Sequence, residues 1–343
     1  MTRLAPLLLA LSLSLATSAG AEIVPDGDCA GVYWDLSTAY ESGDRIYARV
    51  LLTRAGPGDL NAAALGHWID PDGVVTQFQN GRLEGSFALA SPGPRLRIGS
   101  TSLDFSSARR LFEIDNDKRG VKIRIDWEAE APDAAPRRQT SSESLSISAL
   151  DVSRAAVATV WRRGVQTRAL RGFATLVRTR HSVCEREVAA WRVDVHRLAA
   201  RGWLLVHQQL VSGSALSFLD APGSAGAEPA VAFEGWQRAD GAHPLPSRMR
   251  ANGGVFGSID IGATRLSIDP LEALPRLVRM LYWFGAQPRR IWTDASSNLA
   301  WSAGLAALGD PPADLANGAA IATFTFLHPP DDPNLSPPPD SGG

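Results

Sequence analysis

Asp194, His207 and His181 come closest, by type and spacing, to a catalytic group in this chain of 343 residues. Residues 187–211 have the pattern of a β-hairpin, and with a turn at residues 200–201 Asp194 lies opposite His207. A carboxylate beside an imidazole can orient a general acid or base, and burial can keep an acid neutral. The three residues are therefore the candidate catalytic residues of a hydratase, cyclase or isomerase that protonates an alkene.

The alternation within the same hairpin favours a simpler interpretation. Arg192 and His196 share the face of Asp194, whereas Trp191 and Val193 lie on the opposite, apolar face. A strand pair with one apolar and one charged face usually turns its charges to water. We therefore expect Arg192, Asp194 and His196 to be exposed, and a binding protein explains the chain more readily than an enzyme does.

Two arginines and several tryptophans are candidates for ligand contact. Arg178 and Arg180 share one face of a predicted strand, where an exposed edge or a charge-paired rim is the simpler explanation. The alternative is a pair that recognises an anion near a pocket mouth, because guanidinium groups match carboxylate and phosphate geometry. Trp161 and Trp191, among ten tryptophans, can line an apolar interior, although most of the ten are expected to be ordinary core.

Motifs of the common enzyme and metal sites are missing from the sequence. No Gly-x-Ser-x-Gly turn, close-spaced zinc ligand set or glycine-rich phosphate loop is found. Residues 115–120 have the acidic spacing of a calcium loop, but Arg119 stands where an oxygen ligand belongs, so a hairpin turn is expected. The net charge of −2 argues against a nucleic-acid partner. We expect neither a cofactor nor a metal.

Short alternating strands dominate the chain and predict an all-β fold. Residues 121–128 alternate apolar with charged side chains, and residues 45–54 and 321–327 have the same strand-like character. Turn clusters separate such runs at Asp70-Pro71-Asp72-Gly73, Asn80-Gly81, residues 91–94 and residues 115–120. One helix is expected from Asp269 to Gly285, with a kink or later start at Pro275. Barrels or sandwiches explain this pattern better than an α/β fold does.

Composition divides the chain into expected segments. A Pro, Ala, Arg and Ser stretch at residues 131–144 suggests a break, and the boundary is placed just after it, between domains at 22–150 and 151–328. The proline-rich residues 329–343 are expected to form a disordered tail.

The first 21 residues have the pattern of an export signal. Arg3 precedes an apolar stretch, and cleavage is expected after Ala21, which places the mature protein in the periplasm or outside the cell without a membrane span. Cys29 and Cys184 can pair in an oxidising compartment, yet a chain of this length does not require a disulfide. Sequence alone leaves that pairing open.

Several segments together resemble a known superfamily. The similarity lies in four segments: residues 73–85, residues 111–120, Arg171-Gly172-Phe173-Ala174 through Thr179-Arg180-His181-Ser182, and residues 274–292. These segments resemble the two-domain lipocalin-like proteins, which include carotenoid hydratases and fungal survival factors. The resemblance implies two antiparallel β-barrels and a hydrophobic, often lipid or isoprenoid, ligand. The hydratase branch carries an acidic and histidine-bearing motif, but here the cluster Arg178-Thr179-Arg180-His181 lacks the aspartate. No catalytic residue is therefore transferred.

These observations lead to one principal hypothesis and two alternatives. The principal one is an exported lipocalin-like protein that binds or carries a hydrophobic small molecule or lipid by desolvating it in an apolar space. The first alternative is a cofactor-independent hydratase, cyclase or isomerase acting on an isoprenoid-like substrate. The second is a structural or interaction module of the cell envelope, which a large exposed apolar patch would favour.

Overall fold

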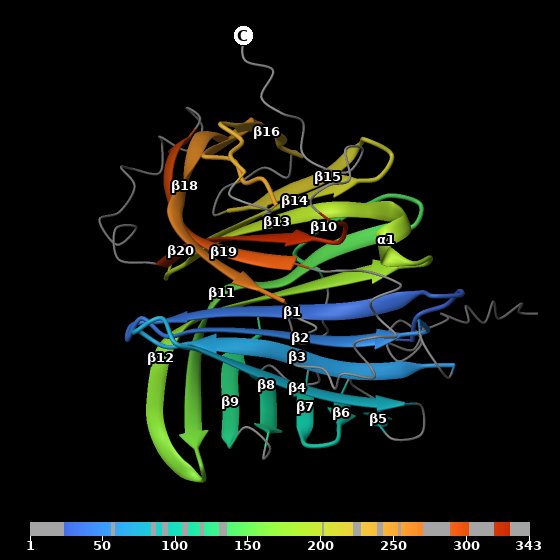
Figure 1. The fold of residues 1–343 in the computed structure, drawn as a ribbon, viewed down its shortest axis with the longest axis vertical. Coiled ribbons are helices and arrows are strands. Elements are labelled where there is room, and N and C mark those ends of the chain that lie inside the picture. Colours follow the sequence, from blue (N-terminus) through green and yellow to red (C-terminus); the bar gives the residue numbers. More distant parts are fainter. Residues whose placement is uncertain are drawn as a thin grey trace, which may run out of the picture.

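Two antiparallel β-sheets, stacked on one another, form the protein (Figure 1). The computed structural model describes residues 24–55, 59–83, 87–90, 95–104, 109–116, 120–129, 136–200, 202–221, 228–238, 243–252, 255–269, 289–301 and 319–329. The predicted all-β fold is confirmed. The expected export signal, the helix at 270–285 and the tail from residue 330 lie outside the described residues.

The first sheet contains twelve strands and the second contains eight. The first sheet comprises β1 (Gly31–Tyr40), β2 (Arg45–Thr53), β3 (Asn61–Ile69), β4 (Val75–Leu83), β5 (Phe87–Ala90), β6 (Arg95–Ile98), β7 (Thr101–Asp104), β8 (Arg109–Asn116), β9 (Val121–Glu128), β10 (Arg138–Ser141), β11 (Leu145–Arg162) and β12 (Val165–His181). The second comprises β13 (Ala189–Leu198), β14 (Trp203–Leu210), β15 (Ala215–Asp220), β16 (Ala230–Glu234), β17 (Arg248–Asn252), β18 (Val255–Ile268), β19 (Arg289–Trp301) and β20 (Ala319–Phe326). A short helix, α1 (Glu185–Val188), joins them. No helix among these elements is long and apolar enough to span a membrane.

Each sheet curls around an apolar interior of its own. In the first sheet β4 and β6, far apart in strand order, come into contact, and the Asn80 side chain donates to the Ile98 carbonyl at 2.8 Å. In the second sheet His207 of β14 and Phe233 of β16 meet with ring centroids 4.9 Å apart. The predicted turn at Asn80-Gly81 is therefore wrong, because both residues lie inside β4, where Asn80 helps to close the curled sheet.

The interior of the first sheet holds two buried carboxylates, each bound to a tryptophan and an arginine. Asp151 accepts from Trp127 Nε1 at 3.0 Å and lies 2.7 Å from Arg110 Nε, with the Arg110 and Asp151 side chains fully buried. Asp44 likewise accepts from Trp68 Nε1 at 2.8 Å and from Arg168 at 2.9 Å. Pairing offsets the large cost of removing these charges from water, so these contacts fix the position of the large indoles.

The chain passes from the first sheet to the second between His181 and Ala189. β11 and β12 are long strands that start or end at the contact between the sheets and run down one side of the first sheet (Figure 1). The expected boundary at 150/151 consequently falls inside β11, and residues 138–141 of the expected linker form β10, which pairs with β11. The change of sheet follows β12 instead of this polar, proline-containing stretch.

The Cys29–Cys184 disulfide stands at this passage between the sheets. It joins the residues just before β1 to the residue just before α1, across a sequence separation of 155. Next to it, Tyr33 of β1 donates to Glu185 of α1 at 2.5 Å. The structure thus ties the beginning of the first sheet to the beginning of the second.

Candidate functional site

The outer faces of the two sheets pack together around a band of buried polar residues. Apolar clusters flank the band on both sides; one includes Leu145, Ile147, Leu204 and Val206, and the other includes Ile69, Leu198, Ile268 and Trp292. Strand register aligns the polar side chains, because cross-strand partners point to the same face. On the first sheet, Ser37, Tyr47, His67 and Gln77 form one row across β1 to β4. On the second sheet, rows Arg192–Thr325–Arg290 and Asp194–Thr323–Trp292 cross β13, β20 and β19.

Within this band, two buried carboxylates are each neutralised by an arginine. Arg49 binds Asp35 in a bidentate arrangement, at 2.8 and 3.0 Å, and Tyr47 donates to the same carboxylate. Arg192 binds Asp194 at 2.8 Å and reaches across to Thr179 of the first sheet at 2.8 Å. Burial opposes ionisation of Asp35, but the combined attraction of Arg49, Arg290 and Arg192 outweighs it and holds the pKa of Asp35 well below its usual value.

Arg290 is a buried cation of a different kind. Arg290 is 3% exposed, and its guanidinium lies over the Tyr47 ring, 3.4 Å from the ring centroid. Among the described residues no carboxylate lies within ion-pair distance of it, and its Nε has no hydrogen-bond partner. Burial lowers the pKa of Arg290, although a guanidinium remains charged at neutral pH.

Two neutral histidines complete the band. Burial, with a contribution from Arg290, lowers the pKa of His67 well below its ordinary value, and burial lowers the pKa of His196 to about 4. The His67 ring lies 5.3 Å from the Tyr47 ring and 5.0 Å from the Trp292 ring, measured between centroids. His67 Nε2, His196 Nδ1 and Trp292 Nε1 are buried without a hydrogen-bond partner. Unpaired buried atoms of this kind are costly and indicate a missing polar partner.

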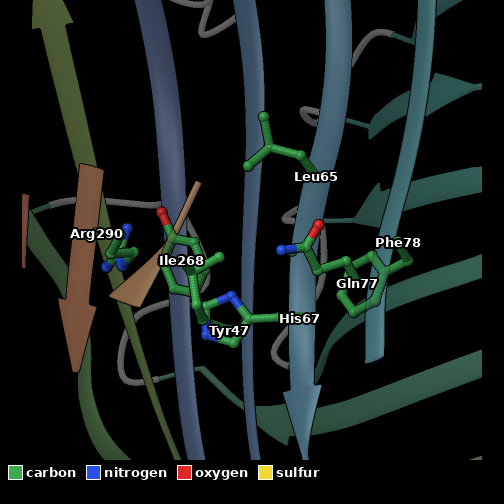
Figure 2. Close-up of a pocket in the computed structure, with 8 residues that line it drawn as sticks. Tyr47, Leu65, His67, Gln77, Phe78, Ile268 and Arg290 are labelled. Carbon is green, nitrogen blue, oxygen red and sulfur yellow. The ribbon is translucent and has the colours of Figure 1, made fainter. Parts of the chain in front are cut away.

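A small pocket opens beside His67, between the two sheets (Figure 2). Tyr47, His67 and Gln77 line it from the first sheet and Arg290 from the second. Its apolar wall consists of Leu65, Gly66, Phe78 and Ile268. The enclosed space is about that of one water molecule. Gly66 allows the Phe78 ring to pack close, since a Cβ there would meet that ring at 2.6 Å. The pocket therefore combines a cation, a neutral imidazole and an apolar wall.

The expected pairing of Asp194 with His207 is wrong. Asp194 pairs with Val206, and His207 pairs with Val193, so Asp194 and His207 point to opposite faces of the second sheet. Arg192, Asp194 and His196 do share one face, as expected, but that face is 3–4% exposed rather than solvated. The first sheet covers it, which a pattern within one hairpin cannot reveal.

His207 and Trp191 belong instead to the interior of the second sheet. His207 Nδ1 lies 2.8 Å from Ser217 Oγ, and its ring contacts Trp191 and Phe233, with centroids 5.3 and 4.9 Å away. Trp191 contacts Phe233 and Trp236, at 5.2 and 5.7 Å between centroids. Both residues are packed in the apolar core there, away from the pocket between the sheets.

The remaining candidate residues are dispersed. Arg178 and Arg180 are half-buried and pair with Trp34 and Val32, on the side of β12 that faces the first sheet's interior, and both are engaged in further interactions. His181 lies at the passage between the sheets, where its Nδ1 is 2.6 Å from the Val183 carbonyl. Trp161 lies at the far end of β11, with Lys122 over its ring at 5.6 Å.

The pocket residues themselves carried little signal in the sequence. Tyr47 and His67 alternate with the core residues of β2 and β3, so the alternation that predicted the strand at 45–54 places Tyr47 on the face away from the interior. Nothing in the sequence joins them to Arg290, which is over two hundred positions away. In the described part of the chain, no group of three or more acidic, histidine or cysteine side chains is placed to hold a metal.

The buried imidazoles predict a loss of stability in mild acid. Burial lowers the pKa of both His196 and His207 to about 4, so between pH ~6.5 and 4 the folded protein binds fewer protons than the unfolded chain. The free energy of unfolding should therefore fall across this window, by about 3 kcal/mol for each histidine. Urea unfolding at pH 7.5 and 4.5 tests this: the loss should be about 2–3 kcal/mol smaller in His207→Asn. An identical loss in the variant and the wild type would contradict the assignment.

Comparison with known proteins gives relatives in fold alone. No protein-family model and no curated protein sequence matches the chain. A protein assigned as an AttH from Nitrosomonas europaea superposes with a TM-score of 0.56 at 14% identity, covering 94% of this chain and 99% of that one. CghA superposes with TM-scores of 0.59 on its own and 0.58 with Sch210972, each at 11% identity over 88% of this chain and 89% of CghA. This chain therefore shares its two-sheet architecture with these proteins over nearly its whole length.

Proposed function

We propose that this protein is an exported member of the two-domain lipocalin-like superfamily and binds a hydrophobic small molecule or lipid between its two sheets. The observation that carries the proposal is the pocket where unpaired buried polar atoms of His67 and Arg290 stand beside an apolar wall. In such a site, desolvation of the apolar part of a ligand supplies affinity and a few polar groups orient it.

Two further observations support this proposal. CghA, which has the same fold, has been crystallised with Sch210972. Export to the periplasm or the medium is consistent with the signal-like residues 1–21 and with the Cys29–Cys184 disulfide.

Native mass spectrometry of the protein purified gently from its source cells tests the binding function. We expect an adduct of small-molecule mass that organic extraction removes, and rebinding of an apolar probe such as retinol, retinoic acid or palmitate. Leu65→Trp, which fills the pocket, should abolish the adduct, whereas Val165→Trp, at a position 66% exposed on the β11–β12 hairpin, should retain it. An empty protein that binds none of the three probes would overturn the proposal and favour an interaction module of the cell envelope.

A cofactor-independent isomerase, cyclase or hydratase is the second candidate function. It is favoured by His67, whose buried neutral imidazole has an unpaired Nε2 beside the pocket and can accept a proton there as a general base. The binding and catalytic proposals differ in what becomes of the bound molecule. Chemical conversion of the extracted ligand by the wild type, lost in His67→Asn with binding retained, would establish catalysis; recovery of the unchanged molecule supports binding alone.

A further inference from the structure

Charges in the polar band between the sheets do not balance. Asp35 is matched by Arg49, and Asp194 is matched by Arg192, each at 2.8 Å. His67 and His196 are neutral, as are Tyr33 and Tyr47, whose pKa values burial raises. Arg290 is left over, which gives the described band one unmatched positive charge.

Neither Asp35 nor Asp194, the two carboxylates that attract Arg290, supplies the missing charge. Asp35 and Asp194 attract Arg290 only over a longer range, and each is already bound to its own arginine. Glu185 binds Tyr33, four residues along β1 from Ser37, the partner of Tyr47. At about 3.3 Å per residue, this places Glu185 roughly 13 Å along the strand from the row of the pocket.

A buried and unmatched guanidinium is expensive to maintain, so its retention requires an explanation. Leaving one charge of a buried pair without its partner is strongly destabilising, because the remaining ion is poorly solvated. Packing over the Tyr47 ring compensates Arg290 in part, since the face of an aromatic ring attracts a cation. The Arg290 guanidinium is also one of the groups that line the pocket (Figure 2).

We propose that Arg290 is the receptor for a single negative charge on the ligand, so that the ligand is an apolar monocarboxylate rather than a neutral lipid. One unmatched charge fits a carboxylate better than a phosphate dianion, and the planar guanidinium binds two carboxylate oxygens at once. Unpaired His67 Nε2 is available as a further hydrogen-bonding group, and the enclosed space, about that of one water molecule, is the size of a single carboxylate oxygen. The apolar body would then lie along Leu65 and Ile268 toward the opening of the pocket. This inference rests on the proposed binding function.

Retinol and retinoic acid test the inference, because they share an apolar body and differ in charge. Isothermal titration calorimetry at pH 7.5 should show the acid binding at least tenfold more tightly than the alcohol. In Arg290→Met, affinity for the acid should fall 10- to 100-fold while affinity for the alcohol changes less than threefold. Arg289→Met is the matched control, since Arg289 is the exposed neighbour on the same strand, and it should bind both probes as the wild type does.

The outcomes separate the inference from the function on which it rests. Equal affinity of the wild type for acid and alcohol, or an equal loss of both in Arg290→Met, would overturn the charge receptor and leave the binding function intact. Binding of neither probe, together with an empty native protein, would overturn the binding function itself. The melting temperature of the ligand-free Arg290→Met protein gives a second readout. It should be unchanged or raised, whereas a structural role for Arg290 predicts a fall.

Discussion

Replacing Asp151 by alanine should lower the free energy of unfolding by about 3–5 kcal/mol, because it removes one partner of a buried ion pair. Arg110 has no exposed surface and would lose the carboxylate 2.7 Å from its Nε, and the Trp127 indole N–H would lose its acceptor. Both residues lie in the core of the first sheet, where water cannot replace the lost partner. Urea unfolding at pH 7, followed by circular dichroism, measures the difference.

The double variant Arg110→Met with Asp151→Asn is the control for this expectation. It removes both charges and keeps an amide oxygen for Trp127, so it should lose less than half as much stability as the single variant. If Asp151→Ala unfolded within 1 kcal/mol of the wild type, the ion pair would not be the stabilising element that its burial implies.

Removal of the disulfide is the second large effect. Cys29→Ser with Cys184→Ser should lower the free energy of unfolding by about 2–5 kcal/mol, because the bond closes a long loop and restricts the unfolded chain. The bond spans 155 positions, so the effect should lie near the upper end of that range. Urea unfolding with and without dithiothreitol measures it.

Reductant serves as the internal control for the disulfide. The wild type in dithiothreitol should unfold at the same urea concentration as the double serine variant, and the variant itself should not respond to the reductant. A wild type that is insensitive to complete reduction would show that the bond contributes no stability.

Local patterns in the sequence predicted the strands because alternation is a property of each strand by itself. Residues 121–128 form β9 with the expected apolar face, and residues 70–73 form the turn before β4. The sequence predicts a turn at Asn80-Gly81 because this pair is a strong signal for a hairpin turn. In the structure, β4 continues through it and Asn80 contacts β6, a long-range contact that has no local signature.

For the hairpin at 189–210, the sequence pattern predicted the two strands but not their register. The existence of the hairpin follows from alternation, but Arg197 pairs with Trp203, one position away from the expected register. A one-residue shift moves every facing partner, so Asp194 and His207 separate to opposite faces. Burial of the charged face could not be inferred either, because a second sheet covers it.

The pocket could not be predicted from the sequence, because the packing of the two sheets creates it. Tyr47, His67 and Arg290 come from three strands in two sheets, and each is unremarkable in its own strand. They become a site only when the two curled sheets stack back to back. The unmatched charge of Arg290 is likewise a property of the assembled interface, since only there can each arginine be assigned its carboxylate.

Because the sheets stack back to back, alternate residues along a strand face either the hydrophobic interior or the interface between the sheets. In β2 and β3 the even-numbered side chains, such as Ile46 and Trp68, fill the hydrophobic interior, while Tyr47 and His67 form the pocket. Neighbouring positions on one strand are therefore under different constraints. Residues that face the interface can change and alter which ligand is bound, while residues that face the interior keep the packing of the core. A lineage with this architecture can acquire new ligands without rebuilding its cores.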